Sequence, residues 1–230
     1  MSAFARSPAC VICLVTPGGA PSSPAVPIAE RVAALDALIR DATSAGIDIV
    51  QIREPDLPAR SLTEGVAAAV QASRGTATRI VVNDRVDIAL AAGADGAHLG
   101  VRSLPTARVR EMTPPGFLLG RSIHTVDDAR GVAAERNLDY VIAGTVFASA
   151  SKPNETRLLG TDGLAAVVRA ANLPVVAIGG IDLETLASVA RTGAAGFAAI
   201  RLFTDAFVRS RLRETVNRAR QAFDTTRVIP

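Results

Sequence analysis

The sequence predicts an α/β fold, a closed (β/α)8 TIM barrel of eight parallel strands that forms one domain over residues 1–230. Its 230 residues suit one such barrel. Short runs rich in β-branched residues alternate with longer amphipathic stretches along the whole chain. The strand runs are apolar throughout, as expected of parallel strands covered on both faces. An open doubly wound sheet is the alternative, but no dinucleotide-binding glycine pattern opens a first helix.

The elements follow from this alternation in order. We expect strands at 10–15, 47–52, 79–82, 96–99, 117–121, 140–143, 175–178 and 196–200. We expect helices at 28–44, 61–73, 86–92, 105–111, 126–135, 161–170, 183–191 and 205–223. Gly46, Gly93 and Gly193 precede the second, fourth and eighth strands, and each can end a helix in the left-handed conformation.

Composition excludes several classes of protein. Half the residues are hydrophobic (49%), the net charge is only +3, and the basic residues are scattered. We therefore expect no nucleic-acid partner. No apolar run reaches the ~18 residues of a membrane span, so we expect a cytoplasmic protein without membrane contact. Cys10 and Cys13 lie in one strand run, where positions three apart face opposite sides, which indicates a structural role.

Polar residues gather where the predicted strands end. In barrels of this kind the site lies at the carboxyl ends of the strands. The residues of this group that we expect to bind substrate are Gln51, Arg53, Asn83, Ser122, Ser149, Ser151 and Lys152. Lys152 is the one lysine in the chain and lies in the loop 148–160, one of two unusual loops with 16–27. A compact ammonium is therefore expected to matter at that position, since Lys and Arg differ in geometry and hydration.

Gly179 and Gly180 follow the seventh strand and predict a phosphate site. Such a turn can expose backbone N–H groups that, together with the following loop and helix, hold a phosphate. Arg201, after the eighth strand, would add positive charge. The alternative is a tight turn before the seventh helix with Asp182 as its N-cap, and both can hold together.

Four motifs resemble one known superfamily. They are VVNDRVDIALAAGADGAHLG (81–100), LLGRSIHTVDDAR (118–130), DYVIAGTVFASASKP (139–153) and PVVAIGGID (174–182). They resemble the thiamine-phosphate synthase and thiazole tautomerase superfamily of thiamin biosynthesis, over residues 48–203. The resemblance implies a (β/α)8 barrel that binds a small phosphorylated thiazole.

In the synthase, a pyrimidine diphosphate loses pyrophosphate with the help of Mg²⁺, and thiazole phosphate captures its methylene. The resemblance would place Gln51, Arg53, Asn83 and Lys152 around the diphosphate, with Asp84 near the metal. Ser103, however, stands where the family's H-x-G-Q-x-D pattern has its aspartate, and Pro55 replaces the lysine of Q-x-R-E-K. A hydroxyl should hold Mg²⁺ less well than a carboxylate does.

The tautomerase needs neither a metal nor a diphosphate pocket, so it is our leading hypothesis from the sequence. His124 in GRSIH matches that branch's catalytic histidine, and a histidine with its ordinary pKa of about 6.5 can accept and donate protons near neutrality. A synthase that requires Mg²⁺ is the alternative. A catalytically silent, regulatory metabolite-binding barrel and a phosphate-binding barrel of another pathway also stay open. Whether the chain forms a homo-oligomer, and what the loop 16–27 does, also stay open.

Overall fold

Eight parallel strands form a closed ring, in the order in which they occur in the chain. The computed structural model describes residues 10–18, 26–135, 137–149 and 157–226. The strands are β1 (Val11–Val15), β2 (Ile49–Ile52), β3 (Arg79–Asn83), β4 (Gly96–Leu99), β5 (Leu118–Ile123), β6 (Tyr140–Gly144), β7 (Val175–Ile178) and β8 (Gly196–Ala199). Strand β1 pairs with both β2 and β8, which closes the barrel. The predicted fold is confirmed.

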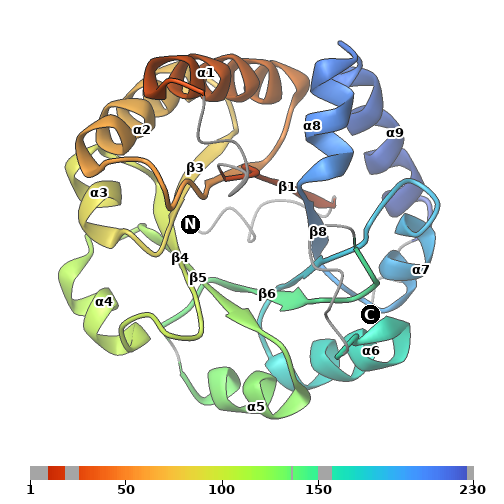
Figure 1. Cartoon of the computed structure of the whole chain (residues 1–230). Coiled ribbons are helices and arrows are strands. Elements are labelled where there is room, and N and C mark those ends of the chain that lie inside the picture. Colours follow the sequence, from red (N-terminus) through yellow and green to blue (C-terminus); the bar gives the residue numbers. More distant parts are fainter. Residues whose placement is uncertain (1–9, 19–25, 136, 150–156, 227–230) are drawn as a thin grey trace.

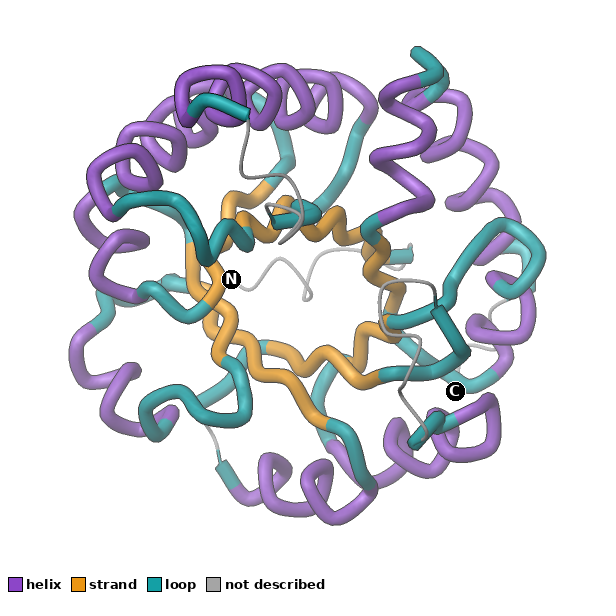
Figure 2. The backbone as a smooth tube through the Cα atoms, in the orientation of Figure 1, coloured by secondary structure: helices purple, strands orange, loops and turns teal. Residues whose placement is uncertain are grey.

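The helices form an outer layer around this ring, as Figures 1 and 2 show. They are α1 (Ile28–Ala45), α2 (Ala59–Ser73), α3 (Val86–Ala91), α4 (Thr106–Met112), α5 (Val126–Ala134), α6 (Gly160–Ala171), α7 (Leu186–Arg191), α8 (Arg201–Val208) and α9 (Leu212–Asp224). Gly46, Gly93 and Gly193 have φ values of 85°, 69° and 84°, so the predicted left-handed helix ends are confirmed.

Two separate apolar clusters hold the barrel together. The inner one fills the ring with side chains such as Val81, Leu118 and Tyr140, and the outer one lies between strands and helices. Cys13 belongs to the inner cluster and Cys10 to the outer one, which confirms their opposite facing. Both side chains are buried.

Tyr140 is the largest side chain inside the ring, and the neighbouring strand makes room for it. A Cβ atom at residue 120 would come within 2.2 Å of the Tyr140 ring, so only glycine fits there. Tyr140 thereby fills the barrel interior beneath the polar residues at the strand ends, which makes this interior a packed core.

The predicted helix 205–223 is wrong, because the chain forms α8 and α9 there with a break between them. Ser210 has φ 54°, the amide of Ser210 donates to Phe207 O, and the amide of Arg211 donates to Ala206 O. These two hydrogen bonds, together with a residue in the left-handed conformation, form a Schellman motif that ends the helix. A glycine usually marks such an end, and here a serine takes its place.

Among the described residues, no helix is both long and apolar enough to cross a membrane.

Candidate active site

Side chains from four neighbouring strands form a polar arc on one side of the barrel mouth. Gln51 of β2 donates from Nε2 to Asn83 Oδ1 of β3 at 3.0 Å. Asn83 is in register with His98 of β4, and His98 Nε2 lies 2.9 Å from Ser122 Oγ of β5. Ile49, Val81 and Leu118 belong to the inner cluster, so residues two or four positions further along the same strands also face inward. We call Gln51, Asn83, His98 and Ser122 the amide arc.

The amide arc is buried at its base and partly open at its top. Gln51 is 4% exposed and His98 1%, whereas Asn83 and Ser122 are half-buried. Gln51 Oε1 is a buried acceptor with no hydrogen-bond partner among the described residues. A buried polar atom of this kind is costly unless a ligand or water satisfies it. The described residues therefore leave one acceptor of the arc without a donor.

Burial sets the charge state of His98. It lowers the pKa of this histidine to about 3, because the charged ring would lose its hydration. His98 is therefore a neutral polar group of the arc near pH 7.

Asp84 lies just above the arc and is held by Ser103. It has φ 62°, and its carboxylate Oδ1 accepts a short hydrogen bond from the Ser103 hydroxyl. The amide of Gly100 donates to Ser103 Oγ at 2.7 Å. The carboxylate of Asp84 is thus already engaged by a hydroxyl, and the described residues contain no cluster of three or more His, Cys, Asp or Glu side chains suited to a metal. This donor set does not fit a preformed Mg²⁺ site.

His124 lies at the start of the loop after β5. Its backbone amide donates to Asp128 Oδ2 at 2.9 Å, and Thr125 and Asp128 form a capping box at the start of α5. Its ring Nδ1 is hydrogen-bonded to the carbonyl oxygen of Gly144 on β6. Since a carbonyl only accepts, Nδ1 carries a proton, and in a neutral ring Nε2 would be the acceptor.

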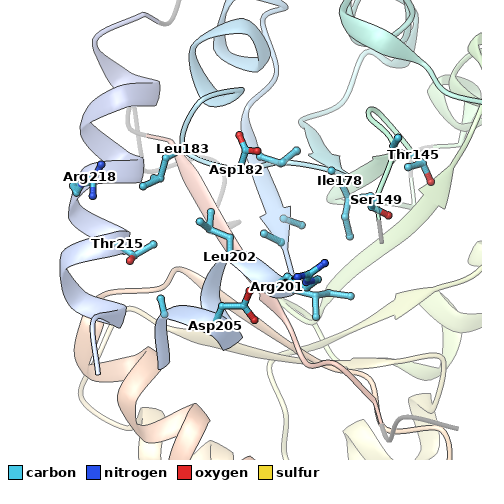
Figure 3. A pocket seen from close by; sticks show the side chains of 18 of the residues that line it. Thr145, Ser149, Ile178, Asp182, Leu183, Arg201, Leu202, Asp205, Thr215 and Arg218 are labelled. Atoms are coloured by element: carbon cyan, nitrogen blue, oxygen red, sulfur yellow. Dashed lines mark ion pairs between the residues drawn. The ribbon is translucent and has the colours of Figure 1, made fainter. Parts of the chain in front are cut away.

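A cavity of about 590 Å³ occupies the other side of the mouth, around the ends of β6, β7 and β8. Ser149, Gly179, Gly180 and Arg201 line it, so these four predicted residues lie together. Figure 3 shows Ser149 and Arg201 at one end, with Thr215 and Arg218 of α9 at the far end.

Two glycines shape the wall of this cavity. Gly179 and Gly180 have φ values of 103° and 63°. A Cβ atom at residue 180 would lie 2.4 Å from the carbonyl oxygen of Ala148, so the turn packs against the loop after β6 through its backbone. Helix α7 begins only at Leu186, and Asp182 Oδ1 accepts from the amides of Glu184 and Thr185 in the turn before it. We call the cavity wall formed by Ser149, Gly179, Gly180 and Arg201 the glycine wall.

Some predicted residues stand apart from these two groups. The amide of Arg53 donates to Thr16 Oγ1 at 2.9 Å, and its exposed side chain lies beside Gly18 in the loop after β1. Ser151 and Lys152 lie outside the described residues.

The extension of the cavity to α9 was not predicted from the sequence, because nothing in the spacing connects Thr215 or Arg218 with the strand ends.

A buried acid at the edge of the mouth was also left without a role. Glu54 is 9% exposed, accepts from the amide of Gly18 at 3.3 Å, and lies 3.7 Å from Arg31. Burial raises the pKa of its carboxyl, and Thr16, Gly18 and Arg31 oppose that rise. Glu54 thus fixes the loop after β1 to the end of β2.

A closed parallel barrel with polar side chains and a glycine turn at the carboxyl ends of its strands defines a class of protein, the TIM-barrel enzymes that act on small phosphorylated metabolites. Sequence comparison narrows this class. The family described as thiamine monophosphate synthase matches residues 25–203. A thiamine-phosphate synthase of Moorella thermoacetica is 39% identical over 187 residues, which are 80% of this chain and 89% of the relative. The chain belongs to this thiamine monophosphate synthase family, and it is an enzyme of that family.

Further comparisons agree with this assignment. A thiamine-phosphate synthase of Anaeromyxobacter dehalogenans is 44% identical over 161 residues, 70% of this chain and 72% of the relative. A solved thiamine phosphate pyrophosphorylase from Pyrococcus furiosus superposes with a TM-score of 0.77 at 28% identity, covering 94% of this chain and 96% of that one.

Proposed function

We propose that the chain is a thiamine-phosphate synthase, which joins hydroxymethylpyrimidine diphosphate to thiazole phosphate and releases pyrophosphate. This reverses the order of our two hypotheses, because the relatives at about 40% identity carry that name. The observation that carries the proposal is the buried acceptor Gln51 Oε1, which has no partner among the described residues. The amino group of an aminopyrimidine is a suitable donor for it. Thiazole phosphate alone would leave this acceptor unused.

In this proposal, each side of the mouth binds one of the two substrates. The pyrimidine diphosphate lies along the amide arc, with Asn83 and Ser122 as neutral donors, and the family resemblance adds Arg53 and Lys152 as cations for the departing oxygens. The thiazole phosphate lies against the glycine wall, held by backbone N–H groups, Ser149, Arg201 and Ser151. Preorganised donors and cations stabilise the charge that grows on the leaving group as the methylene C–O bond breaks. The thiazole nitrogen then donates its lone pair to the methylene carbon, and no proton transfer is required.

A coupled assay tests the proposal. Both substrates are mixed with the purified chain, with and without Mg²⁺, and pyrophosphate release is followed. We expect release only when both substrates are present. Absence of release above background at high enzyme concentration would contradict the proposal. Because Asp84 is already engaged by the Ser103 hydroxyl, the same assay measures how strongly this chain depends on added metal.

One observation favours a second function, thiazole tautomerisation. His124 donates a hydrogen bond from Nδ1 to Gly144 O, so Nε2 of the neutral ring would be the nitrogen that accepts a proton from a substrate. If this activity exists, turnover of the thiazole carboxylate phosphate should survive EDTA and be lost in His124→Ala. Full turnover in that variant would eliminate the histidine as the base. A chain that binds thiazole phosphate but gives no signal in either assay would be a silent regulatory barrel.

A further inference from the structure

His98 is a buried side chain that reaches the substrate side of the mouth only through another residue. Its exposure is 1%, and its Nε2 lies 2.9 Å from Ser122 Oγ. On its other side the ring lies 5.6 Å, centroid to centroid, from the Tyr140 ring. Ser122 itself is half-buried at the end of β5. The hydrogen bond that the His98 ring makes among the described residues is therefore the one to the Ser122 hydroxyl.

The surroundings of His98 select one tautomer. The ring Nδ1 is buried and has no hydrogen-bond partner among the described residues. A buried N–H without an acceptor loses its hydration and gains no hydrogen bond in return, and orphaned buried N–H groups are rare in proteins. The proton of the neutral ring therefore belongs on Nε2, the nitrogen that faces Ser122.

This tautomer determines what the serine can do. If Nε2–H donates to Ser122 Oγ, the serine cannot donate its own proton to His98. The Ser122 hydroxyl can then donate its proton to another acceptor, and Ser122 lies on the inward side of β5 near its carboxyl end. With the other tautomer, Ser122 would donate to His98 and offer only lone pairs to a ligand.

We propose that His98 is a positioning residue that, as its Nε2–H tautomer, commits the Ser122 hydroxyl to donate to an anionic oxygen of the ligand. The choice of a diphosphate oxygen as that acceptor rests on the proposed function. The tautomer and its effect on Ser122 do not. The oxygen of a phosphate or diphosphate only accepts hydrogen bonds, so it is the matching partner for a serine fixed as a donor.

Nitrogen NMR tests the tautomer without any assay of activity. The chain contains only two histidines, so a tag-free, ¹⁵N-labelled sample and its His124→Gln variant suffice to assign the His98 ring. Long-range ¹H–¹⁵N correlations distinguish a protonated Nε2 from a protonated Nδ1. We expect the proton on Nε2. A proton on Nδ1 overturns the proposal whatever the activity of the enzyme is.

A mutant cycle tests the effect on Ser122, with inorganic pyrophosphate as the probe in calorimetry. Ser122→Ala and His98→Leu should each weaken pyrophosphate binding by about tenfold, the value of one lost hydrogen bond. The double variant should bind no worse than Ser122→Ala alone, because both changes remove the same donor. His98→Gln carries an amide N–H near the place of Nε2 and should recover most of the loss seen in His98→Leu.

The outcomes separate this proposal from a purely structural role and from the proposed function. Additive losses in the double variant, or equal losses in His98→Gln and His98→Leu, would show that His98 acts only through packing. Thermal unfolding of each variant identifies those that fail to fold, and the NMR result stands in that case. If the wild type releases no pyrophosphate in the coupled assay, the proposed function fails while the tautomer is still decided by NMR.

Discussion

The amide arc and the glycine wall face each other across one barrel mouth, yet side chains form the arc and mainly backbone forms the wall. The arc consists of side chains that hydrogen-bond one another, with Gln51 Nε2 3.0 Å from Asn83 Oδ1 and His98 Nε2 2.9 Å from Ser122 Oγ. The wall consists mainly of backbone, with two glycines at positive φ beside a cavity of about 590 Å³. The arc suits a ligand with both donors and acceptors, and the wall suits a phosphate that only accepts.

The two sides also differ in how deeply their ionisable side chains are buried. The arc contains a buried histidine, whereas the charged residue of the glycine wall, Arg201, is 62% exposed. Changes to the arc should therefore alter both specificity and the pH dependence of stability. Changes to the wall should alter phosphate affinity through shape.

The largest expected effect is that of Gly180→Val on the glycine wall. The new side chain would overlap the Ala148 carbonyl, at 2.4 Å from its Cβ, and would have to adopt φ 63°. We expect the affinity for thiazole phosphate to fall about 100-fold, which corresponds to about 2.7 kcal/mol. Calorimetry measures this. The matched control is Gly131→Ala on the exposed side of α5, where a Cβ meets nothing within 4 Å, and unchanged affinity in Gly180→Val would refute the steric account.

The next effect concerns His98 and the pH dependence of unfolding. Burial lowers the pKa of His98 to about 3 in the folded chain, whereas an unfolded histidine titrates near 6.5. The unfolded state therefore binds one more proton as the pH falls below about 6.5, and stability is lost in that direction. The loss from this one group is about 2 kcal/mol between pH 8 and pH 5.

Denaturant unfolding at both pH values, in wild type and His98→Gln, isolates this contribution. The variant should lose about 2 kcal/mol less than the wild type over the same interval. Equal losses in the two proteins would show that His98 is not held neutral by burial.

A smaller effect is expected from Gln51→Leu in the amide arc. The change removes the buried acceptor Oε1 and leaves Asn83 Oδ1 without its donor. We expect kcat/KM for the pyrimidine diphosphate to fall about tenfold, and the Kd of thiazole phosphate to stay within about twofold. Gln71→Leu on the exposed face of α2 is the matched control. A loss of thiazole phosphate affinity instead would mean that the arc does not bind the pyrimidine.

The smallest effect should come from Arg201→Ala. Its guanidinium is 62% exposed and lies 3.8 Å from Asp205, so the ion pair adds less than about 0.5 kcal/mol to stability. A melting temperature within about 2 °C of the wild type is the expected result. The affinity for thiazole phosphate should fall about threefold, since the cation is screened by solvent. A loss as large as that of Gly180→Val would show that charge outweighs shape in the glycine wall.

The fold could be predicted because the alternation of apolar strand runs and amphipathic helices is a local pattern. It gave all eight strands near their observed positions, and the glycine helix ends at Gly46, Gly93 and Gly193. The division between α8 and α9 escaped it, because the left-handed residue there is Ser210, and the polar and apolar spacing continues on either side.

The placement of the candidate site residues could be predicted only in part. The rule that barrel sites lie at strand ends selected Gln51, Asn83, Ser122 and the Gly179–Gly180 turn, which do line the mouth. The links between them depend on register across strands. The contact of His98 with Ser122 joins residues 24 positions apart, and no spacing in a single sequence predicts it.

The central claim is that the two sides of the mouth bind two ligands at the same time. Calorimetry with inorganic pyrophosphate and thiazole phosphate tests it most directly, by titrating each in the absence and presence of saturating amounts of the other. We expect both to bind together, with each Kd changed by less than about threefold. If the apparent Kd of one ligand rises in proportion to the concentration of the other, the two compete for one place and the division of the mouth is wrong.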